Sequence, residues 1–500
     1  MECILSCGAS PTCGTRLVAD RRAPRRRLPA ARQPRSALSQ VAATSRGRVV
    51  VSGGGLAGML TTLALRNIGF DATCYDRGED AVPTHARRGL QVWPFAVDAL
   101  RMIDETLCDA LLSHGDLLDV AVLRNPSGEL LRKVDLPSRI LAISSDAVLD
   151  LLQSRLPSTA VVHGHTLETL EVTHSPRAEH AVLCVLDAHG SGSRVGVPAD
   201  ILVGADGLRS RVRSQLHAPE SVVDAGSTAW RGSVRRSDVP ADLCPPGASV
   251  YTFTPDGRTM WLTSLTTGGG SHGGTISWVL CAPSLSEAGH EATPVVHGTD
   301  HAEPISAEHR VLNWLTHRPG LSLQQARTVP RVEQRIRSTF HEFTAVKHLM
   351  GATQAGSIVE RRLFHRAAHG ATSPAECGEL KVDTSGRGPV TLVGDAAHMC
   401  VPSLGLGACL TIQGVATLMA ALDAVPPGSS RAAVEAALRQ SERTHSAFVS
   451  DMTHAALEQA NYVAHMAPGA AIPDSGAAFQ GWLLGNSRRG AMAAVHAAGR

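Results

Sequence analysis

The first apolar segments of the chain predict a parallel sheet covered by helices. Residues 48–52 (RVVVS) form a short run without polar alternation, which is typical of a strand with both faces covered. Apolar residues then recur at helical spacing in LAGMLTTLALRNIG (56–69), and Gly69 can end that helix. FDATCYD (70–76) predicts a second strand that ends at Asp76. The order of strand, glycine turn, helix, strand and acid predicts a βαβ unit.

The turn between the first strand and its helix carries three glycines with dinucleotide-type spacing. Gly53 permits the turn, Gly55 lets the backbone approach a pyrophosphate, and Gly58 lets the helix pack closely on the strand. The helix N-terminus adds N–H groups and partial positive charge. Asp76, 23 residues after Gly53, can accept hydrogen bonds from an adenosine ribose. The pattern favours a dinucleotide site, and the alternative is a purely structural turn.

A second match to the same glycine spacing lacks this context. Gly268, Gly270 and Gly273 lie between two apolar segments, 258–265 and 275–283, each of which predicts a strand. No helical period follows these glycines directly. We therefore expect a hairpin loop here rather than a phosphate site.

Two later segments combine a buried strand with a glycine turn. ADILVGADGLRSRVR (199–213) predicts a strand that runs into Asp206 and Gly207, followed by a basic segment. GPVTLVGDAAHMCVPSLGLGACLTIQGVATLMAAL (388–422) predicts a strand that ends in Gly-Asp, a loop with proline and glycines, and a helix. Taken alone, the first segment also fits a strand before an Arg-rich surface helix. The second also fits a buried turn that caps a core helix.

Together, in this order, the three segments resemble the FAD-dependent aromatic hydroxylase family. These single-component flavin monooxygenases include para-hydroxybenzoate hydroxylase, the ubiquinone-pathway hydroxylases and zeaxanthin epoxidase. The resemblance runs from about residue 48 to about residue 450 and is dense only in the three segments. It implies an α/β fold, in which a Rossmann-type FAD-binding domain with a parallel sheet is joined by an antiparallel-sheet substrate domain and C-terminal helices.

The same resemblance implies which residues bind FAD. The first glycine turn and Asp76 would hold the ADP half, and Asp206 and Gly207 would lie near the pyrophosphate. Asp395 would bond the ribityl chain, and a helix that starts after Gly407 would point N–H groups at the flavin edge where negative charge gathers on reduction. The implied set is Gly53, Gly55, Gly58, Asp76, Arg77, Arg87, Arg88, Asp206, Gly207, Gly394, Asp395, Pro402, Gly405, Gly407 and Ala408.

Several positions depart from the family pattern. The family usually carries Glu at the position of Asp76, which is one methylene shorter but keeps the same acceptors. Ser145 stands where an Arg commonly reaches the FAD, so one charged contact is lost. The other departures are Leu406 for Gln, Gln413 and Gly414 for an acidic pair, and Phe95 for Asn. These changes predict altered flavin affinity or pocket chemistry.

Two further candidate site residues can also be explained without a role in the site. Arg87 or Arg88, in HARRGLQVWPFAVDAL (85–100), is expected to contact FAD, and the alternative is a solvated basic turn. His398 directly follows a Gly-Asp-Ala-Ala turn, and we interpret it as a structural hydrogen-bonding residue rather than a general base. The sequence identifies no catalytic side chain.

The middle of the chain predicts the substrate domain. From Trp230 to Ala282, four strand-like segments separated by Gly, Pro and Asp turns predict an antiparallel sheet. Its tryptophans and tyrosine do not indicate a binding wall, because aromatic residues in strands more often belong to the core. The polar segment 284–309 predicts a loop. It contains histidines with metal-like spacing, but Gly298 and Pro304 break any helix there, so we expect no metal site.

These patterns divide the chain into four predicted parts. Residues 1–47 form a disordered transit peptide, and 48–225 together with 388–430 form the FAD-binding domain. Residues 226–387 form the substrate domain, and 431–500 form a C-terminal helical region with a helix over 431–465.

Charge is distributed unevenly along the chain, and this supports the prediction of an N-terminal transit peptide. Residues 1–48 contain ten Arg and two acids, a net charge of +8, whereas the whole chain carries +2. An Arg-rich, acid-poor segment without an apolar core is typical of organelle import, to the chloroplast first and the mitochondrion second. The alternative is a basic tail that binds nucleic acid. Because no basic patch with interleaved aromatics follows, we expect no nucleic-acid partner.

Composition narrows the class further. The chain is 43% hydrophobic and 18% charged, which is ordinary for a globular enzyme. No run of about 18 apolar residues predicts a membrane span, although peripheral association with a membrane is compatible with this pattern. The eleven cysteines show no C-x-x-C pair and fit reduced thiols.

The resemblance implies an FAD-dependent monooxygenase that uses NAD(P)H as a transient co-substrate and O2. Oxygen would pass from a C4a-hydroperoxyflavin to an aromatic, quinone-like or isoprenoid small molecule. Two alternatives remain: an FAD-dependent reductase of the same fold, and a non-catalytic flavin-binding relative. The sequence does not determine the substrate or the oligomeric state.

Overall fold

The computed structural model describes several stretches of the chain, all within the compact unit Ser45–Arg500. They are residues 45–78, 89–173, 179–188, 193–217, 222–265, 274–284, 325–354, 357–366, 386–399 and 405–464. Residues 1–44 of the predicted leader, Arg87, Arg88, Pro402 and the histidines of the predicted loop lie outside these described residues.

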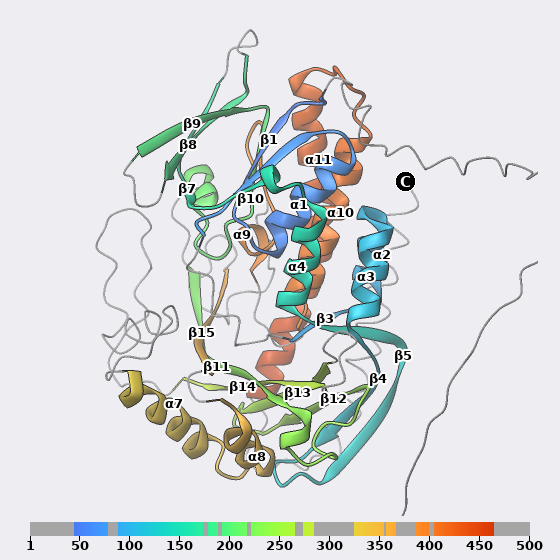
Figure 1. The fold of residues 1–500 in the computed structure, drawn as a ribbon, viewed down its shortest axis with the longest axis vertical. Helices are drawn as coiled ribbons and strands as arrows, with labels where there is room; N and C mark the ends of the chain where they lie inside the picture. Colours follow the sequence, from blue (N-terminus) through green and yellow to red (C-terminus); the bar gives the residue numbers. More distant parts are fainter. Residues whose placement is uncertain are drawn as a thin grey trace, which may run out of the picture. The chain divides into compact units, whose positions relative to one another are not determined.

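A five-stranded parallel sheet, sheet A, has the order β16-β10-β1-β2-β6 (Figure 1). Val49, Val50 and Val51 of its central strand are at most 1% exposed, which explains why that strand lacks polar alternation. The strands are β1 (Arg48–Ser52), β2 (Asp71–Tyr75), β6 (Val161–Val162), β10 (Ile201–Gly204) and β16 (Val390–Leu392).

Helices from distant parts of the chain pack on sheet A. Helix α1 (Leu56–Asn67) packs against α10 (Gly407–Asp423), and α10 packs along α11 (Arg431–Ala464). In Figure 1 these three helices run close together beside the sheet, with α10 and α11 in orange and red. The other face is covered by α5 (Arg211–Leu216), α9 (Asp395–His398) and a three-stranded antiparallel sheet of β7 (His165–Val172), β8 (Val182–Ala188) and β9 (Ser193–Ala199).

An eight-stranded sheet, sheet B, has the order β15-β11-β14-β13-β12-β4-β5-β3. Its pairs are antiparallel except for β12 with β4, which is parallel. The strands are β3 (Gly89–Val92), β4 (Asp116–Arg124), β5 (Leu130–Ser144), β11 (Val222–Arg235), β12 (Ala248–Phe253), β13 (Thr259–Leu265), β14 (Thr275–Pro283) and β15 (Val359–Arg366).

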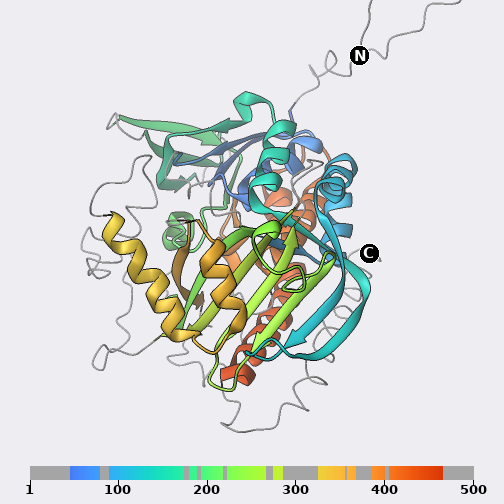
Figure 2. The same cartoon turned by 60° about the horizontal axis from the view of Figure 1, so that its bottom comes forward.

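The two faces of sheet B pack against different partners. Helices α7 (Gln325–Thr339) and α8 (Thr344–Ala352) lie across one face, as Figure 2 shows in gold and orange. Trp278, fully buried, belongs to the core between them and the sheet. We call the opposite face the inner face. Tyr251 and Leu265 on it belong to the same core as residues of α1 and α10.

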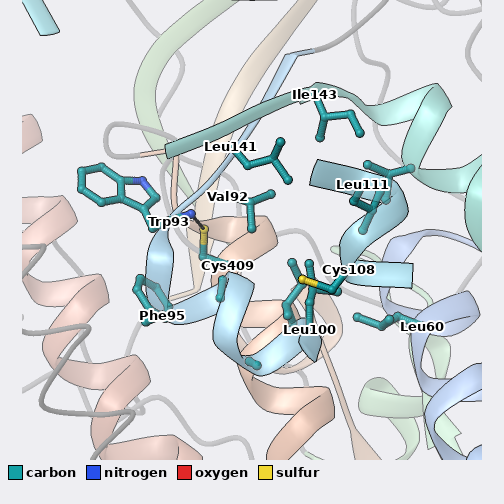
Figure 3. Packing of buried hydrophobic residues seen from close by; sticks show 14 of the residues in the cluster. Leu60, Val92, Trp93, Phe95, Leu100, Cys108, Leu111, Leu141, Ile143 and Cys409 are labelled. Atoms are coloured by element: carbon teal, nitrogen blue, oxygen red, sulfur yellow. Dashed lines mark hydrogen bonds between the residues drawn. The ribbon is translucent and has the colours of Figure 1, made fainter. Parts of the chain in front are cut away.

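That shared core connects the two sheets. Figure 3 shows Leu60 of α1, Leu100, Cys108 and Leu111 close to the strand residues Leu141 and Ile143. Helices α2 (Pro94–Ile103), α3 (Glu105–His114) and α4 (Ser145–Arg155) complete it, and η2 (Ser158–Ala160) and η3 (Arg236–Asp238) are short 3-10 turns.

The predicted fold class is confirmed, because a parallel Rossmann-type sheet and a largely antiparallel second sheet are both present. The four strands expected between residues 230 and 282 are β11 to β14, and the helix expected over 431–465 is α11. Strands β13 and β14 pair as a hairpin around the second glycine match, whose glycines lie outside the described residues. The contribution of residues 89–144 to sheet B was not predicted.

Within the described residues, we find no helix with the length and hydropathy needed to cross a bilayer.

Candidate functional site

The glycine turn after β1 is shaped by close packing. Gly53 has φ +106°, and a Cβ there would lie 2.5 Å from the carbonyl oxygen of Ala205. A Cβ on Gly58 would lie 1.7 Å from the carbonyl oxygen of Gly53. Both positions therefore require glycine for the reasons expected of a dinucleotide turn, namely the bend and the close approach of helix to strand.

Gly55 differs from these two because its surroundings are open. It is the N-cap of α1, no side chain caps the helix, and no heavy atom lies within 4 Å of an added Cβ. The first N–H groups of α1 lack intrahelical partners, as in every helix, and carry partial positive charge. An open, uncapped helix N-terminus is a cradle that fits a pyrophosphate.

Asp76 follows β2 and lies beside this cradle. Its Oδ1 accepts a hydrogen bond from the Gly54 N–H at 3.0 Å, and its Oδ2 accepts one from the Gly78 N–H at 3.2 Å. The carboxylate remains about one-third exposed and faces His163 at 3.8 Å. Each oxygen keeps a second lone pair, so the group can still accept ribose hydroxyls. Arg77, the next residue, is exposed.

Asp206 follows β10 and accepts hydrogen bonds from the start of α5, whose N-cap is Ser210. Its Oδ2 accepts from the backbone N–H groups of Arg211 at 2.7 Å and Val212 at 3.2 Å. Its Oδ1 is buried and has no hydrogen-bond partner in the described part of the chain. Burial raises the pKa of Asp206 above its ordinary value. A buried acceptor without a donor fits a ligand hydroxyl or a bound water at this position. Gly207 follows with φ +77° and open space around it.

The turn after β16 is wedged between two helices. Gly394 has φ +60°, and a Cβ there would lie 2.8 Å from the Cβ of Ala57 on α1 and 3.3 Å from Thr411 Oγ1 on α10. Asp395 begins α9 and is exposed. The close packing of Gly394 therefore fixes Asp395 near the first turns of both α1 and α10.

A second open turn precedes α10. Gly405 has φ +65°, and neither Gly405 nor Gly407 has a heavy atom within 4 Å of an added Cβ. No side chain caps α10, whose first turn contains Gly407 and Ala408. Cys409 anchors this turn to β3, because the Gln91 carbonyl lies 3.3 Å and the Trp93 backbone N–H 3.4 Å from its Sγ (Figure 3).

These turns meet at one edge of sheet A. β1, β10 and β16 are neighbours and parallel, so their carboxyl ends, at Ser52, Gly204 and Leu392, lie side by side. Ligands bind to open α/β sheets at this edge. The structure brings together twelve of the fifteen predicted residues here, since Arg87, Arg88 and Pro402 lie outside the described residues.

A buried histidine pair supports the turn after β16 from behind. His398, at the end of α9, and His445, on α11, are 2% and 8% exposed, and their Nε2 atoms lie 3.4 Å apart. Burial, and secondarily the charge of His398, lowers the pKa of His445 well below its usual value. The buried guanidinium of Arg213 donates to the carbonyls of Ala396 and Ala397 at 3.4 Å.

A structural role is predicted for His398 from the sequence, whereas its partner His445 was not predicted. Taken alone, His445 is one polar residue on a long helix. The signal that could have found it is Gly414, where the family carries an acidic residue. A Cβ on Gly414 would lie 2.9 Å from His445 Nε2, so the glycine makes room for this ring.

Ser145, which stands where the family has Arg, begins α4. Its hydroxyl lies 3.4 Å from Asp146 Oδ1, and the preceding Ser144 caps the helix by accepting the Ala147 N–H at 3.2 Å. The segment thus keeps a capped helix without an arginine.

A family model described as "FAD binding domain" matches residues 46–284 and 326–456, well over half of the chain. The chain belongs to this FAD-binding family. The matched ranges include every turn described above, and the two sheets together with the helices that connect them.

The curated relatives share about a quarter of their aligned residues with this chain. The chain is 26% identical over 384 residues to chloroplastic zeaxanthin epoxidase of Solanum lycopersicum, which covers 73% of this chain and 46% of the relative. It is 24% identical over 384 residues to the Arabidopsis thaliana enzyme, covering 74% and 47%. The chain therefore spans about half the length of the curated relatives it matches.

Solved structures share the fold at low identity. Klebsiella pneumoniae HpxO complexed with FAD and uric acid matches with a TM-score of 0.63 and 17% identity, over 89% of this chain and 95% of that one. The 2,6-dihydroxypyridine-3-hydroxylase of Arthrobacter nicotinovorans matches with a TM-score of 0.62 and 16% identity, over 85% and 95%. The predicted FAD-dependent aromatic hydroxylase family, the class of FAD-dependent oxidoreductase, and FAD as cofactor are confirmed at the level of the family.

Proposed function

We propose that this protein is an FAD-dependent monooxygenase that uses NAD(P)H and O2 to hydroxylate or epoxidise an aromatic, quinone-like or isoprenoid small molecule. The observation that carries the proposal is the meeting of two open, uncapped helix N-termini, α1 and α10, at the carboxyl edge of sheet A. The start of α1 suits the diphosphate of FAD, and the start of α10 lies where the ring system of the same cofactor would reach.

Each predicted residue has a role in this proposal. Gly53, Gly55 and Gly58 give the pyrophosphate access to α1, and Asp76 accepts hydrogen bonds from the adenosine ribose. Arg77 supports that end, and Asp206 with Gly207 borders the pyrophosphate. Asp395, held by Gly394, accepts from the ribityl chain, and Gly405, Gly407 and Ala408 face the ring system. Arg87, Arg88 and Pro402 complete the set from the sequence.

FAD, when bound, supplies the hydride acceptor and the activation of O2. The chain's own groups orient it and tune its surroundings. The N–H groups at the start of α10 place partial positive charge at the ring edge and favour negative charge there. Cys409, in the same turn, is buried, and burial raises the pKa of its thiol to about 12, so it stays neutral beside that charge. The apolar core of α1, α2 and β5 behind the turn excludes water from one side.

The domain roles and the location are part of the proposal. Sheet A with its helices binds FAD, and sheet B with α7 and α8 provides the substrate domain. Residues 1–47 direct the chain to an organelle, the chloroplast first and the mitochondrion second. The support is the arginine-rich composition of this segment and the word chloroplastic in the names of the curated relatives.

Oxygen uptake by the purified protein with FAD and NADPH tests the proposal, with panels of phenols, quinones and carotenoids as substrates. We expect substrate-dependent bleaching and recovery of the flavin absorbance together with a product that has gained one oxygen atom. Bleaching with no oxygen gain by any product would indicate the reductase alternative. Bound FAD that NAD(P)H cannot reduce would indicate the non-catalytic alternative, and failure to bind FAD would refute all three.

A further inference from the structure

A slot opens in sheet B where β12 begins later than the two strands beside it. β12 lies between β13 and β4, and its first pair with β4 is Ala248 with Val120 (Figure 1). Residues 116–119 of β4 and Leu265 at the end of β13 extend past that start. A cavity of about 230 Å³ lies between these strand ends. Its walls include Asp116, Leu117, Arg236, Pro246, Ser264 and Leu265.

One buried hydroxyl joins two charged side chains at this slot. Ser264 is 2% exposed, and its Oγ donates to Asp116 Oδ2 at 2.8 Å. The same oxygen accepts from the guanidinium of Arg236 at 2.6 Å, and Arg236 also donates to the Cys244 carbonyl. Within the described residues, Asp116 and Arg236 form no ion pair with each other or with another group. The slot therefore carries a negative and a positive charge that do not neutralise each other directly.

Both charged groups keep hydrogen-bonding atoms that the described part of the chain does not use. Asp116 Oδ1 accepts no hydrogen bond there, and Arg236 Nε donates none. Neither atom is buried, so each can be reached from outside. The slot thus presents an anionic acceptor and a cationic donor to a ligand.

The other walls of the slot are apolar. Leu117 is 37% exposed, Pro246 is exposed, and Leu265 is buried behind them. A ligand that covers Leu117 would remove apolar surface from water, which is favourable. A cavity of roughly 150 Å³ is enough to bind benzene. This slot therefore has room for an aliphatic or aromatic side chain in addition to the charged groups of a ligand.

We propose that the slot binds an α-amino acid with an apolar side chain, with its ammonium on Asp116 and its carboxylate on Arg236. The two charges of an amino acid lie close together, and Asp116 and Arg236 flank the single hydroxyl of Ser264, so one molecule can reach both. Charge-assisted hydrogen bonds of this kind are the stronger ones. A ligand with one charge would leave the other protein charge unpaired. The slot shares no residue with the turns at the carboxyl edge of sheet A, so this inference goes beyond the proposed function and does not depend on it.

Calorimetric titration of the full chain with three probes tests the proposal. The probes are L-leucine, leucinamide, which lacks the carboxylate, and 4-methylpentanoate, which lacks the ammonium. We expect L-leucine to bind at least about tenfold more tightly than either analogue, because each analogue loses one charged hydrogen bond. Equal affinity for all three probes would overturn the proposal. So would the absence of saturable binding of L-leucine at about 10 mM, which would leave Ser264 and its partners as a structural link between strand ends.

Substitutions assign each charge to its partner. D116N should weaken L-leucine about tenfold and leave 4-methylpentanoate unchanged, whereas R236M should weaken L-leucine and leave leucinamide unchanged. The matched controls are D119N on β4 and R235M at the end of β11, which remove the same charges from exposed neighbouring residues. An equal loss in these controls would show general electrostatic attraction and overturn the assignment. Arg236 also bonds Cys244 and Ser264, so thermal unfolding is measured for every variant. The comparison of the three probes needs no variant and decides the proposal even if R236M does not fold.

The carboxamide of NADPH also combines a donor with an acceptor, so L-leucine is titrated again in the presence of NADPH. Unchanged affinity supports an amino-acid site. Competition between the two would place the dinucleotide in the slot and overturn the amino-acid assignment. A protein that binds L-leucine but not FAD would refute the proposed function alone.

Discussion

His445 Nε2 lies 3.4 Å from His398 Nε2, and both imidazoles are buried between α9, α10 and α11. One ring must donate a proton to the other, so the contact requires at least one neutral imidazole. The pair links the long C-terminal helix to the turn that carries Asp395. Nδ1 of His445 is buried without a hydrogen-bond partner in the described part of the chain, so this ring is held chiefly by His398 and by packing.

Replacing His445 should weaken both the fold and FAD binding. H445F keeps a ring of similar size but removes the contact with His398, and we expect a loss of about 1–3 kcal/mol in the free energy of unfolding. Chemical denaturation and FAD titration measure the two effects. H341F, at an exposed histidine on another part of the chain, is the control and should change neither.

The pair should also make stability depend on pH. The pKa of His445 is depressed in the folded state, so between that value and about 6.5 the unfolded chain binds more protons. Stability is therefore fully present above about pH 6.5 and falls as the pH is lowered. Among the described residues, the other charged groups near the pair are Arg213 and, one turn earlier on α11, Glu442, whose pKa burial raises. Denaturation midpoints between pH 7.5 and 5.5 should show a smaller slope in H445F, and an unchanged slope would contradict this assignment.

Gly414 should not tolerate a side chain while His445 is present. In G414A the new Cβ would lie 2.9 Å from His445 Nε2, and we expect a destabilisation of about 1–3 kcal/mol. In the double variant G414A/H445A the smaller residue on α11 should relieve part of this cost. A double-mutant cycle of unfolding free energies measures the coupling, and additive effects would show that the two sites are independent.

Two glycines of the first turn should separate folding from cofactor binding. G58A places a Cβ 1.7 Å from a backbone carbonyl and should destabilise the fold by about 3 kcal/mol or more. G55A meets nothing within 4 Å, so the protein should fold normally but bind FAD more weakly, because the methyl group enters the open cradle. Thermal unfolding and FAD titration compare the two variants. Normal FAD affinity in G55A would place the pyrophosphate elsewhere.

Asp76 should contribute to FAD affinity through its charge. D76N keeps the shape but places an amide opposite the N–H groups of Gly54 and Gly78, and we expect FAD affinity to fall about tenfold. D71N, at the exposed start of the same strand, is the matched control and should bind FAD like the wild type. Equal affinity in both variants would exclude Asp76 from the site.

Much of the FAD-binding half could be predicted from the sequence because its signals are local. Gly53 and Gly58 are dictated by contacts within a few residues along the chain or across one strand pair. The strands of sheet B between residues 230 and 282 were also predicted, from alternation and turn residues. What the sequence did not show depends on long-range pairing. The addition of β3, β4 and β5 to sheet B, the contact of His445 with His398, and the contact of Asp116 with Ser264 all arise from register between distant segments.

Gln91 accepts from Cys409 through its backbone and donates to Ser249 and Thr263 through its side chain. One residue thus connects the first turn of α10 to the inner face of sheet B. A substitution in these strands that changes ligand specificity must preserve the hydrogen bonds of Gln91, or the start of α10 will move with the strand. Divergence toward new substrates is therefore least constrained at the edge of sheet B formed by β11 and β15, because the side chain of Gln91 bonds only to β12 and β13 among the described residues.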